Sequence, residues 1–358
     1  MNMDAGTLVI LTPGFPESES DSTCLPSQQL FVGALNKIYP RLKIVVLSFE
    51  YPFRKSTYIW KGNQVFSYHG WKKGRLEKIR TCFAVWNRLR KLRRENKVIG
   101  LLSFWCTECA WIGKHFARFH HLIHHIWILG QDARKENKWV SRISPQPEEL
   151  IAMSDFLAGE FFRNHGVRPK YIIPNAIEPD LFKAPPGERD IDLLGVGSLI
   201  ALKQYDIFIA VAKALSGFMP QLHCVICGMG PEQENLQSLI NQLHLGNHVR
   251  LIGEKPHSEV LALMQRSRIL LHPSSYEGYS TVCLEALYAG AQVISFCNPK
   301  ESWIRHWHIV ISQEDMIHVA TDTLSDQDTG HQPILVYSME QQAGAVMDLY
   351  DYKEEAIV

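Results

Sequence analysis

The chain alternates short apolar runs with amphipathic segments, and this alternation predicts a parallel α/β architecture. In the first half, strands are expected at residues 7–12, 43–48, 98–104 and 123–129. Helical periodicity predicts helices at residues 27–38, 78–95 and 107–119, and residues 49–71 are expected to form a polar connection. Strands separated by helices of this length are typical of a parallel sheet with helices on both faces.

A second alternation follows residues 174–189, whose proline and charge content indicates a linker. Beyond it, strands are expected at residues 191–196, 222–227, 249–252, 269–271 and 292–295, with a helix at 205–215. We predict two doubly wound, Rossmann-like domains at residues 1–178 and 190–335, facing a cleft. A C-terminal helix within residues 336–358 is expected to pack back toward the first domain. Sheets of this kind bind ligands at the carboxyl ends of their strands.

Composition narrows the class of protein. A chain of 358 residues suits two domains, and 46% hydrophobic with 21% charged residues is typical of a folded globular protein. The 37 basic and 37 acidic residues balance, so charge gives no reason to expect a nucleic-acid partner. Eight cysteines without a dense framework, no leader-like start and no long apolar run predict a cytoplasmic protein with reduced thiols.

Two carboxylates in the second half indicate a binding site. Glu277 and Glu285 have seven residues between them. The residues before Glu277 predict a strand that runs into a turn, and residues 281–290 predict a helix that begins at a hydroxyl cap and ends at a glycine. A helix N-terminus favours an anion, and carboxylates accept hydrogen bonds from hydroxyl groups. The pattern therefore predicts a site for a phosphorylated sugar.

Four segments in this half resemble the family-4 glycosyltransferases, which are retaining enzymes with the GT-B fold and are also called glycosyl transferases group 1. Residues 195–203 resemble the family's phosphate-binding loop, and residues 227–232, 249–254 and 277–285 follow in the family's order. The resemblance covers roughly residues 191–297. It implies a hexosyltransferase that moves a sugar from a nucleoside-diphosphate sugar to an acceptor hydroxyl, in the synthesis of cell-surface polysaccharide or glycolipid.

The resemblance also implies roles for individual residues. Lys203 would place its ammonium on the donor diphosphate, Glu285 would accept from the ribose hydroxyls, and Glu277 would hold hydroxyls of the donor sugar. Because no suitable loop carries an Asp-x-Asp pattern, no metal and no cofactor are expected. The other residues expected to bind the donor are Gly278, Tyr279, Ser280, Thr281, Ser198, Gly14, Gly228 and Gly230.

The first half resembles the family less closely. Residues 128–132 occupy the place of the family's His-Gly-x-Asp element, and Asp132 and Arg134 are candidates for the acceptor side. Leu129 stands where many members carry a histidine, and Ser198 stands where many carry a phosphate-binding arginine. An inactive member and another GT-B enzyme, such as a nucleotide-sugar epimerase, are therefore alternatives.

A metal site is a further alternative. Cys106 and Cys109, followed by His120, His121, His124 and His125, approximate a Cys₂His₂ zinc pattern, so the chain could be a zinc-bearing binding protein. The ten residues between Cys109 and His120 are fewer than in the usual zinc finger. They also suit the helix of a β-α-β unit, which is the interpretation we favour.

A basic amphipathic segment at residues 78–97 allows two interpretations. It carries eight lysines and arginines interleaved with apolar residues. Such a helix lies either on the anionic inner surface of a membrane or on the sheet with its charges in solvent. The first interpretation suits a lipid-linked acceptor, whereas a purely saccharide acceptor requires no membrane contact.

Overall fold

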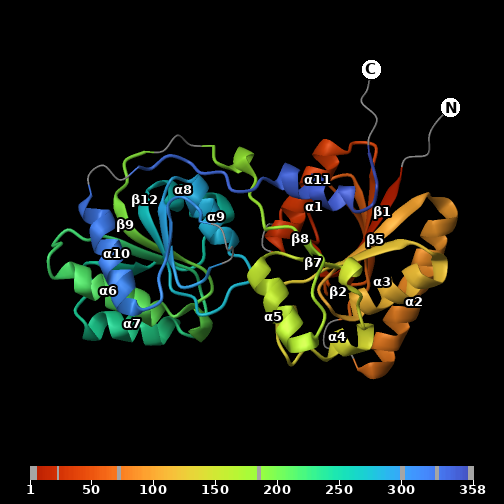
Figure 1. Ribbon diagram of the computed structural model, residues 1–358, viewed down its shortest axis with the longest axis horizontal. Helices are drawn as coiled ribbons and strands as arrows, with labels where there is room; N and C mark the ends of the chain where they lie inside the picture. The colour runs from red at the N-terminus through yellow and green to blue at the C-terminus, as the bar shows by residue number, and fades with distance from the viewer. Residues whose placement is uncertain are drawn as a thin grey trace, which may run out of the picture. The chain divides into compact units, whose positions relative to one another are not determined.

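The computed structural model describes residues 6–21, 24–70, 74–183, 187–298, 303–326 and 330–353. Residues 184–186 of the predicted linker and residues 354–358 of the predicted C-terminal segment lie outside this description. The chain divides into two compact units (Figure 1). The first comprises Met1–Asn175 and Met339–Val358, and the second comprises Ala176–Ser338. The chain therefore enters the second unit once and returns to the first.

The first unit contains an eight-stranded sheet in the order β3-β4-β2-β1-β5-β6-β7-β8. Its strands are β1 (Thr7–Gly14), β2 (Lys43–Tyr51), β3 (Ser56–Trp60), β4 (Asn63–Ser67), β5 (Val98–Phe104), β6 (Ile123–Trp127), β7 (Leu150–Ala152) and β8 (Tyr171–Ile172). All neighbouring strands are parallel except β3 and β4. The central strands are apolar on both sides because helices cover both faces of the sheet.

The hairpin β3–β4 corrects the prediction of a polar connection at residues 49–71. Lys61 and Gly62 form its two-residue turn, with positive φ values of 44° and 81°. Turns with two positive φ angles match the twist of the flanking strands, and glycine adopts this conformation at little cost. The hairpin continues the sheet beyond β2, because β4 pairs with β2 in parallel.

Helices cover the first sheet on two sides. They are α1 (Pro26–Ile38), α2 (Arg75–Glu95), α3 (Glu108–His120), α4 (Lys138–Ile143), α5 (Asp155–His165) and α11 (Met339–Asp348). Val9 and Leu101 share a buried cluster with side chains of α2 and α3. On the opposite face, the Phe31 ring of α1 packs edge-on against Phe104, with centroids 6.2 Å apart. None of the described helices is long and apolar enough to cross a membrane.

The C-terminal segment belongs to the fold of the first unit. Helix α11 packs on α1, where Lys37 and Glu340 form an ion pair of 2.8 Å. Beyond the helix, the buried Tyr350 hydroxyl donates to the carbonyl of Leu101 at 2.7 Å. Gly100 permits this contact, since a Cβ at that position would lie 2.5 Å from the Tyr350 ring. Residues near the C-terminus therefore pack against the first sheet.

The second unit contains a six-stranded sheet in the order β11-β10-β9-β12-β13-β14, with all neighbours parallel. Its strands are β9 (Ile191–Val196), β10 (Cys224–Cys227), β11 (Val249–Leu251), β12 (Ser267–His272), β13 (Gln292–Ser295) and β14 (Trp307–Ile309). Its helices are α6 (Tyr205–Ser216), α7 (Gln233–Gln242), α8 (His257–Gln265), α9 (Thr281–Tyr288) and α10 (Gln313–Ser325). Parallel strands need such crossover connections.

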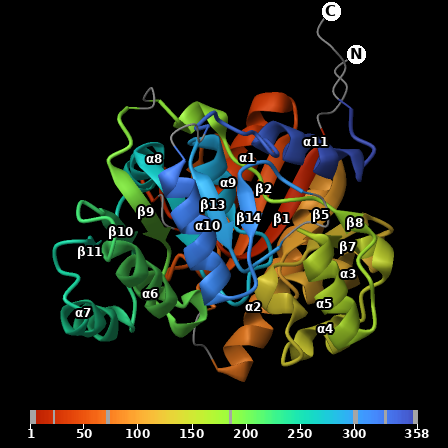
Figure 2. The same cartoon turned by 60° about the vertical axis from the view of Figure 1, so that its left-hand side comes forward.

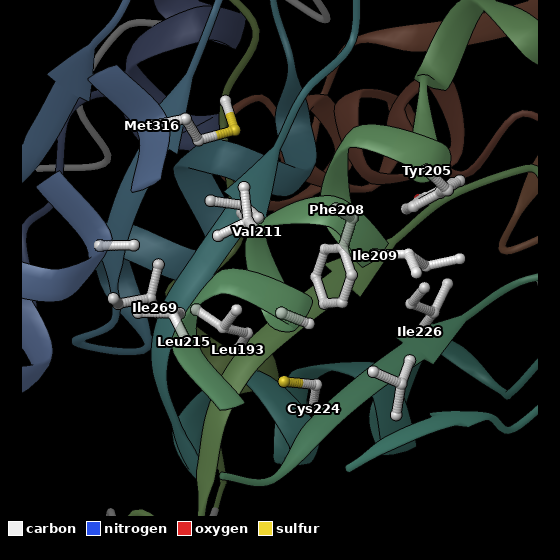
Figure 3. Close-up of a cluster of buried hydrophobic side chains, with 14 of the residues drawn as sticks. Leu193, Tyr205, Phe208, Ile209, Val211, Leu215, Cys224, Ile226, Ile269 and Met316 are labelled. Atoms are coloured by element: carbon white, nitrogen blue, oxygen red, sulfur yellow. The ribbon is translucent and has the colours of Figure 1, made fainter. Parts of the chain in front are cut away.

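The core of the second unit lies between its sheet and helices α6, α7 and α10. Phe208 of α6 lies among Leu193 of β9 and Ile226 of β10, and all three side chains are fully buried (Figure 3). Helix α10 contacts α6 and contributes Met316 to the same cluster (Figure 2). Helices α8 and α9 contact each other. The apolar packing fixes the strands whose carboxyl ends carry the candidate site.

Candidate functional site

The loops that follow β9 and β12 are bonded to each other. The two strands are parallel neighbours, so their carboxyl ends lie at the same edge of the sheet. The loop after β9 contains the short helix η4 (Ala201–Lys203). The carbonyl of Leu202 accepts hydrogen bonds from the Ser275 N–H at 3.0 Å and the Ser274 hydroxyl at 3.3 Å. These bonds hold Lys203 beside the loop that carries Glu277.

Lys203 and His272 converge on Glu277. The Lys203 ammonium forms an ion pair with Oε1 of Glu277, and Nε2 of His272 bonds the same oxygen at 3.1 Å. Burial favours a raised pKa for Glu277, but the His272 hydrogen bond and the Lys203 charge outweigh it and lower this pKa to about 2. Glu277 is therefore ionised at neutral pH. The Lys203 and Glu277 side chains are each 19% exposed, so solvent reaches them.

Glu285 is held by a second histidine. Its carboxylate lies in the second turn of α9 and is buried, and Oε1 accepts a hydrogen bond of 2.7 Å from Nε2 of His257. His257 is the first residue of α8. The bond to Glu285 raises the pKa of His257 against the opposing effect of burial. The protonated imidazole is thus stabilised beside a carboxylate at the carboxyl edge of the sheet.

Sequence reasoning identified both glutamates and missed both histidines. His257 lies 28 positions before Glu285, and His272 lies five positions before Glu277. Neither spacing belongs to a local motif. The contact of His257 with Glu285 arises from packing of α8 on α9, and the contact of His272 with Glu277 depends on how the loop after β12 turns back on the end of the strand. The only available signal was the position of His272 at the end of a predicted strand.

The start of α9 differs in detail from the prediction. Ser280 holds the expected cap position in an extended conformation, but its hydroxyl makes no capping hydrogen bond to the first turn. Thr281 begins the helix, and the buried residues Gly278 and Tyr279 precede it. Gly290 follows the end of the helix with a φ of 82°, as the glycine stop predicts.

The predicted glycines lie where two loops touch. A Cβ on Gly228 would lie 1.9 Å from the carbonyl oxygen of Gly197, and a Cβ on Gly230 would lie 2.3 Å from that of Leu199. Both glycines therefore allow the loop after β10 to pack directly on the loop after β9. This contact supports the segment that carries Ser198, whose side chain is exposed at the edge of the sheet.

The predicted residues of the first unit occupy a different environment. Gly14 ends β1 at the carboxyl edge of the first sheet, and Arg134 is exposed in the loop after β6. Asp132 is only 2% exposed. Its carboxylate accepts hydrogen bonds from the backbone N–H groups of Cys106 at 3.0 Å and Leu129 at 2.9 Å. Burial raises the pKa of Asp132 to about 7 despite these bonds. The two bonds tie the loop after β5 and the loop after β6 to this carboxylate.

The cysteine and histidine residues of the zinc alternative do not converge. Cys109 is buried, Nε2 of His124 bonds the Ser103 hydroxyl at 2.9 Å, and Nε2 of His125 lies 3.3 Å from the carbonyl of Leu349. Within the described ranges, no three His, Cys, Asp or Glu side chains are grouped so that they could hold a metal ion. The zinc alternative therefore lacks a ligand set in this part of the chain.

The segment that carries the candidate site is similar in sequence to a known family. Residues 177–315 match the sequence model of the family described as glycosyl transferases group 1. The gpi3 subunit of phosphatidylinositol N-acetylglucosaminyltransferase from Schizosaccharomyces pombe is 33% identical over 127 residues, which is 35% of this chain and 28% of that protein. The 2-deoxystreptamine N-acetyl-D-glucosaminyltransferase of Niallia circulans is 30% identical over 106 residues, which is 30% of this chain and 27% of that protein. The chain spans little more than a quarter of the length of these curated relatives.

Structural comparison extends to the whole chain. Sucrose-phosphate synthase from Thermosynechococcus elongatus superposes with a TM-score of 0.67 at 15% identity, over 96% of this chain and 94% of that chain. Anabaena HepE, solved in complex with UDP and glucose, gives a TM-score of 0.63 at 14% identity, over 96% of this chain and 97% of that chain. At this identity the likeness concerns the fold alone. The chain thus has the two-domain α/β fold of GT-B glycosyltransferases, and its residues 177–315 match the glycosyl transferases group 1 family.

Proposed function

We propose that this protein is a retaining, family-4 glycosyltransferase that moves a sugar from a nucleoside-diphosphate sugar to an acceptor hydroxyl. One observation carries the proposal. Inside the segment that matches the family, an ionised Glu277 contacts Lys203 at the carboxyl edge of a parallel sheet, where ligands of such sheets bind. The buried Glu285 follows in the helix that begins four residues after Glu277.

Each of these three residues has a separate role in the proposal. The Lys203 ammonium stabilises negative charge on the diphosphate as the bond between the anomeric carbon and the phosphate oxygen breaks. Glu285 accepts hydrogen bonds from the ribose hydroxyls, and Glu277 accepts them from the donor sugar. The acceptor oxygen bonds the anomeric carbon on the face that the phosphate leaves, and its proton passes to the departing phosphate oxygen. No resident cofactor is needed for this scheme.

The relatives suggest which donor to test first. The two curated relatives described above are N-acetylglucosaminyltransferases by name, and HepE was solved with UDP. We therefore propose UDP-N-acetylglucosamine as the first candidate donor. The acceptor in this proposal is a saccharide or a lipid-linked saccharide of the cell surface.

The basic helix supports a peripheral position on the inner face of a membrane. One side of α2 packs into the first unit through Val85 and Leu89. On the other side, Leu76, Ile79 and Phe83 are 76%, 64% and 68% exposed. Helical spacing continues this exposed face toward the C-terminal end of α2, where a surface hollow is lined by Asn87, Arg90, Lys91, Arg94 and Glu95. Apolar side chains beside a basic cluster suit an anionic bilayer surface.

A screen of nucleotide sugars tests the proposed function. The purified protein is incubated with UDP-N-acetylglucosamine and, separately, with other uridine- and guanosine-diphosphate sugars. We expect one of them to release its nucleoside diphosphate with water as the acceptor, and NMR, recorded before the freed sugar mutarotates, to show that this sugar keeps the anomeric configuration of the donor. An isomerised nucleotide sugar would identify an epimerase. If the protein cleaves none of the nucleotide sugars and binds no nucleotide, the proposal is contradicted.

A further inference from the structure

Two hydrogen-bond donating side chains, one flexible and one rigidly held, contact the same oxygen of Glu277. Lys203 reaches Oε1 with the end of a flexible four-carbon chain that begins at the last residue of η4. His272 reaches the same Oε1 at 3.1 Å from the last residue of β12, and its side chain is only 4% exposed. The backbone of His272 is paired with Ser295 in β13, so the sheet holds the Cα from which the imidazole extends.

The ammonium of Lys203 already lies beside the loop that resembles a phosphate-binding loop. A Cβ on Gly197 would lie 3.9 Å from Nζ of Lys203. A diphosphate carries more than one negative charge and attracts an ammonium more strongly than a single carboxylate does. The bonds of the Leu202 carbonyl to the loop after β12 hold the backbone next to Lys203 in place. A turn of Lys203 toward a phosphate therefore needs rotation of its side chain and no movement of the backbone. Glu277 then loses one of its two partners when the donor arrives.

We propose that His272 is a positioning residue that keeps Glu277 in place while Lys203 turns from Glu277 to the donor diphosphate. This inference rests on the proposed function. An ionised carboxylate only accepts hydrogen bonds, so Nε2 of His272 carries the hydrogen and donates it to Oε1. Neither bond uses Oε2 of Glu277, which is the oxygen offered to a hydroxyl of the donor sugar.

The inference separates binding of the sugar from binding of the nucleotide. UDP contacts Lys203 and Glu285 in the proposed site, whereas only UDP-N-acetylglucosamine also reaches Glu277. In His272→Leu, we expect the dissociation constant for UDP-N-acetylglucosamine to rise about tenfold or more, because a hydrogen bond to a charged group is lost. The dissociation constant for UDP should stay within about twofold, and kcat should fall about tenfold or more.

Two further variants separate a positioning role from a purely structural one. His272→Gln offers an N–H donor and should recover most of the lost affinity and turnover. His308→Leu is a matched control, since Nε2 of His308 bonds Gln292 at 3.1 Å in the same sheet but away from Glu277. The decrease in Tm of His308→Leu gives the loss of stability expected when a histidine hydrogen bond is removed from this sheet. That control should leave both dissociation constants unchanged.

A double mutant tests whether His272 acts through Glu277. Adding His272→Leu to Glu277→Gln should weaken UDP-N-acetylglucosamine binding no further than Glu277→Gln alone. Full additivity, equal losses for UDP and UDP-N-acetylglucosamine, or wild-type behaviour of His272→Leu would each overturn the inference. If the wild-type protein turns over a nucleotide sugar and one of these results appears, the inference alone fails. If the wild-type protein binds and turns over none, the proposed function fails with it.

Proton NMR of histidine-labelled wild-type protein does not depend on the folding of His272→Leu. His272→Gln assigns the Nε2–H signal of His272 by its disappearance. We expect this signal to persist when UDP saturates the site, because the bond to Glu277 remains while Lys203 turns away. Loss of the signal on UDP binding would overturn the inference.

Discussion

Nε2 of His257 lies 2.7 Å from Oε1 of Glu285, which joins the first turn of α8 to the second turn of α9. The bond gives a buried carboxylate a charged partner at the edge of the sheet where the donor ribose is proposed to bind. Through this bond, the stability of the second unit depends on the protonation state of the His257 imidazole.

The His257–Glu285 bond predicts a stability that depends on pH. The hydrogen bond to Glu285 raises the pKa of His257 above its unfolded value of about 6.5. The protonated imidazole therefore contributes fully below about pH 6.5, and its contribution is lost as pH rises through the raised pKa of the folded state. His257→Leu should lower the unfolding free energy by about 1 kcal/mol at pH 6 and by less at pH 9. Thermal unfolding at the two pH values checks this, and an equal loss at both would contradict it.

Glu285 is expected to govern nucleotide affinity. Glu285→Gln keeps the size of the side chain but removes the charge that strengthens hydrogen bonds from the ribose hydroxyls. Isothermal titration calorimetry with UDP should show affinity reduced about tenfold or more. Glu259→Gln is the control, because this residue of α8 is exposed and its ion pair is with Lys255, at 3.9 Å. Unchanged UDP affinity in Glu285→Gln would contradict the ribose role.

Gly228 is expected to tolerate no side chain. A Cβ there would lie 1.9 Å from the Gly197 carbonyl oxygen, and Gly228 has a φ of 153°. Gly228→Ala should therefore displace the loop after β9 and lower the unfolding free energy by about 2 kcal/mol or more, with weaker UDP binding. A Cβ on Gly246 meets nothing within 4 Å, so Gly246→Ala should change neither quantity appreciably. Urea unfolding of the two variants provides the comparison, and equal stability would show that the loops can separate freely.

The exposed face of α2 is expected to bind anionic vesicles. Replacing Leu76, Ile79 and Phe83 by serine should reduce sedimentation with phosphatidylglycerol vesicles, because these three side chains supply the apolar contact. Replacing Arg90 and Arg94 by serine should weaken binding by about 1 kcal/mol per residue, and added salt should have a similar effect. Ile311→Ser, at a 92% exposed position of the second unit, is the control. Equal binding by all variants would contradict a membrane contact through α2.

The sequence predicted the fold where burial is continuous. Strand β1 and its neighbours β2 and β5 carry apolar residues on both faces, so each appears in the sequence as a continuous apolar run. The hairpin β3–β4 was missed because β3 alternates in burial and resembles a polar connection. Its Lys61–Gly62 turn was the local signal that could have revealed it.

The sequence predicted less of the site, for a different physical reason. Lys203 and Glu277 were each assigned a ligand, but their ion pair joins residues 74 positions apart and depends on how β9 and β12 lie in the sheet. The three-dimensional structure was needed to identify His272 and His257 as partners of the two glutamates. Asp132 stays a candidate for the acceptor side, and the three hydrogen-bond donors that hold its buried carboxylate were not predicted from the sequence.

Turnover by Glu277→Gln tests the central claim most directly. The measurement is the rate at which the nucleoside diphosphate is released from UDP-N-acetylglucosamine, or from whichever nucleotide sugar the screen identifies, alongside the dissociation constant for that nucleoside diphosphate. We predict that Glu277→Gln binds UDP as the wild-type protein does but turns over about 100-fold more slowly, because the carboxylate that holds the donor sugar is gone. A wild-type rate in Glu277→Gln would contradict the assignment of this edge of the second sheet as the donor site.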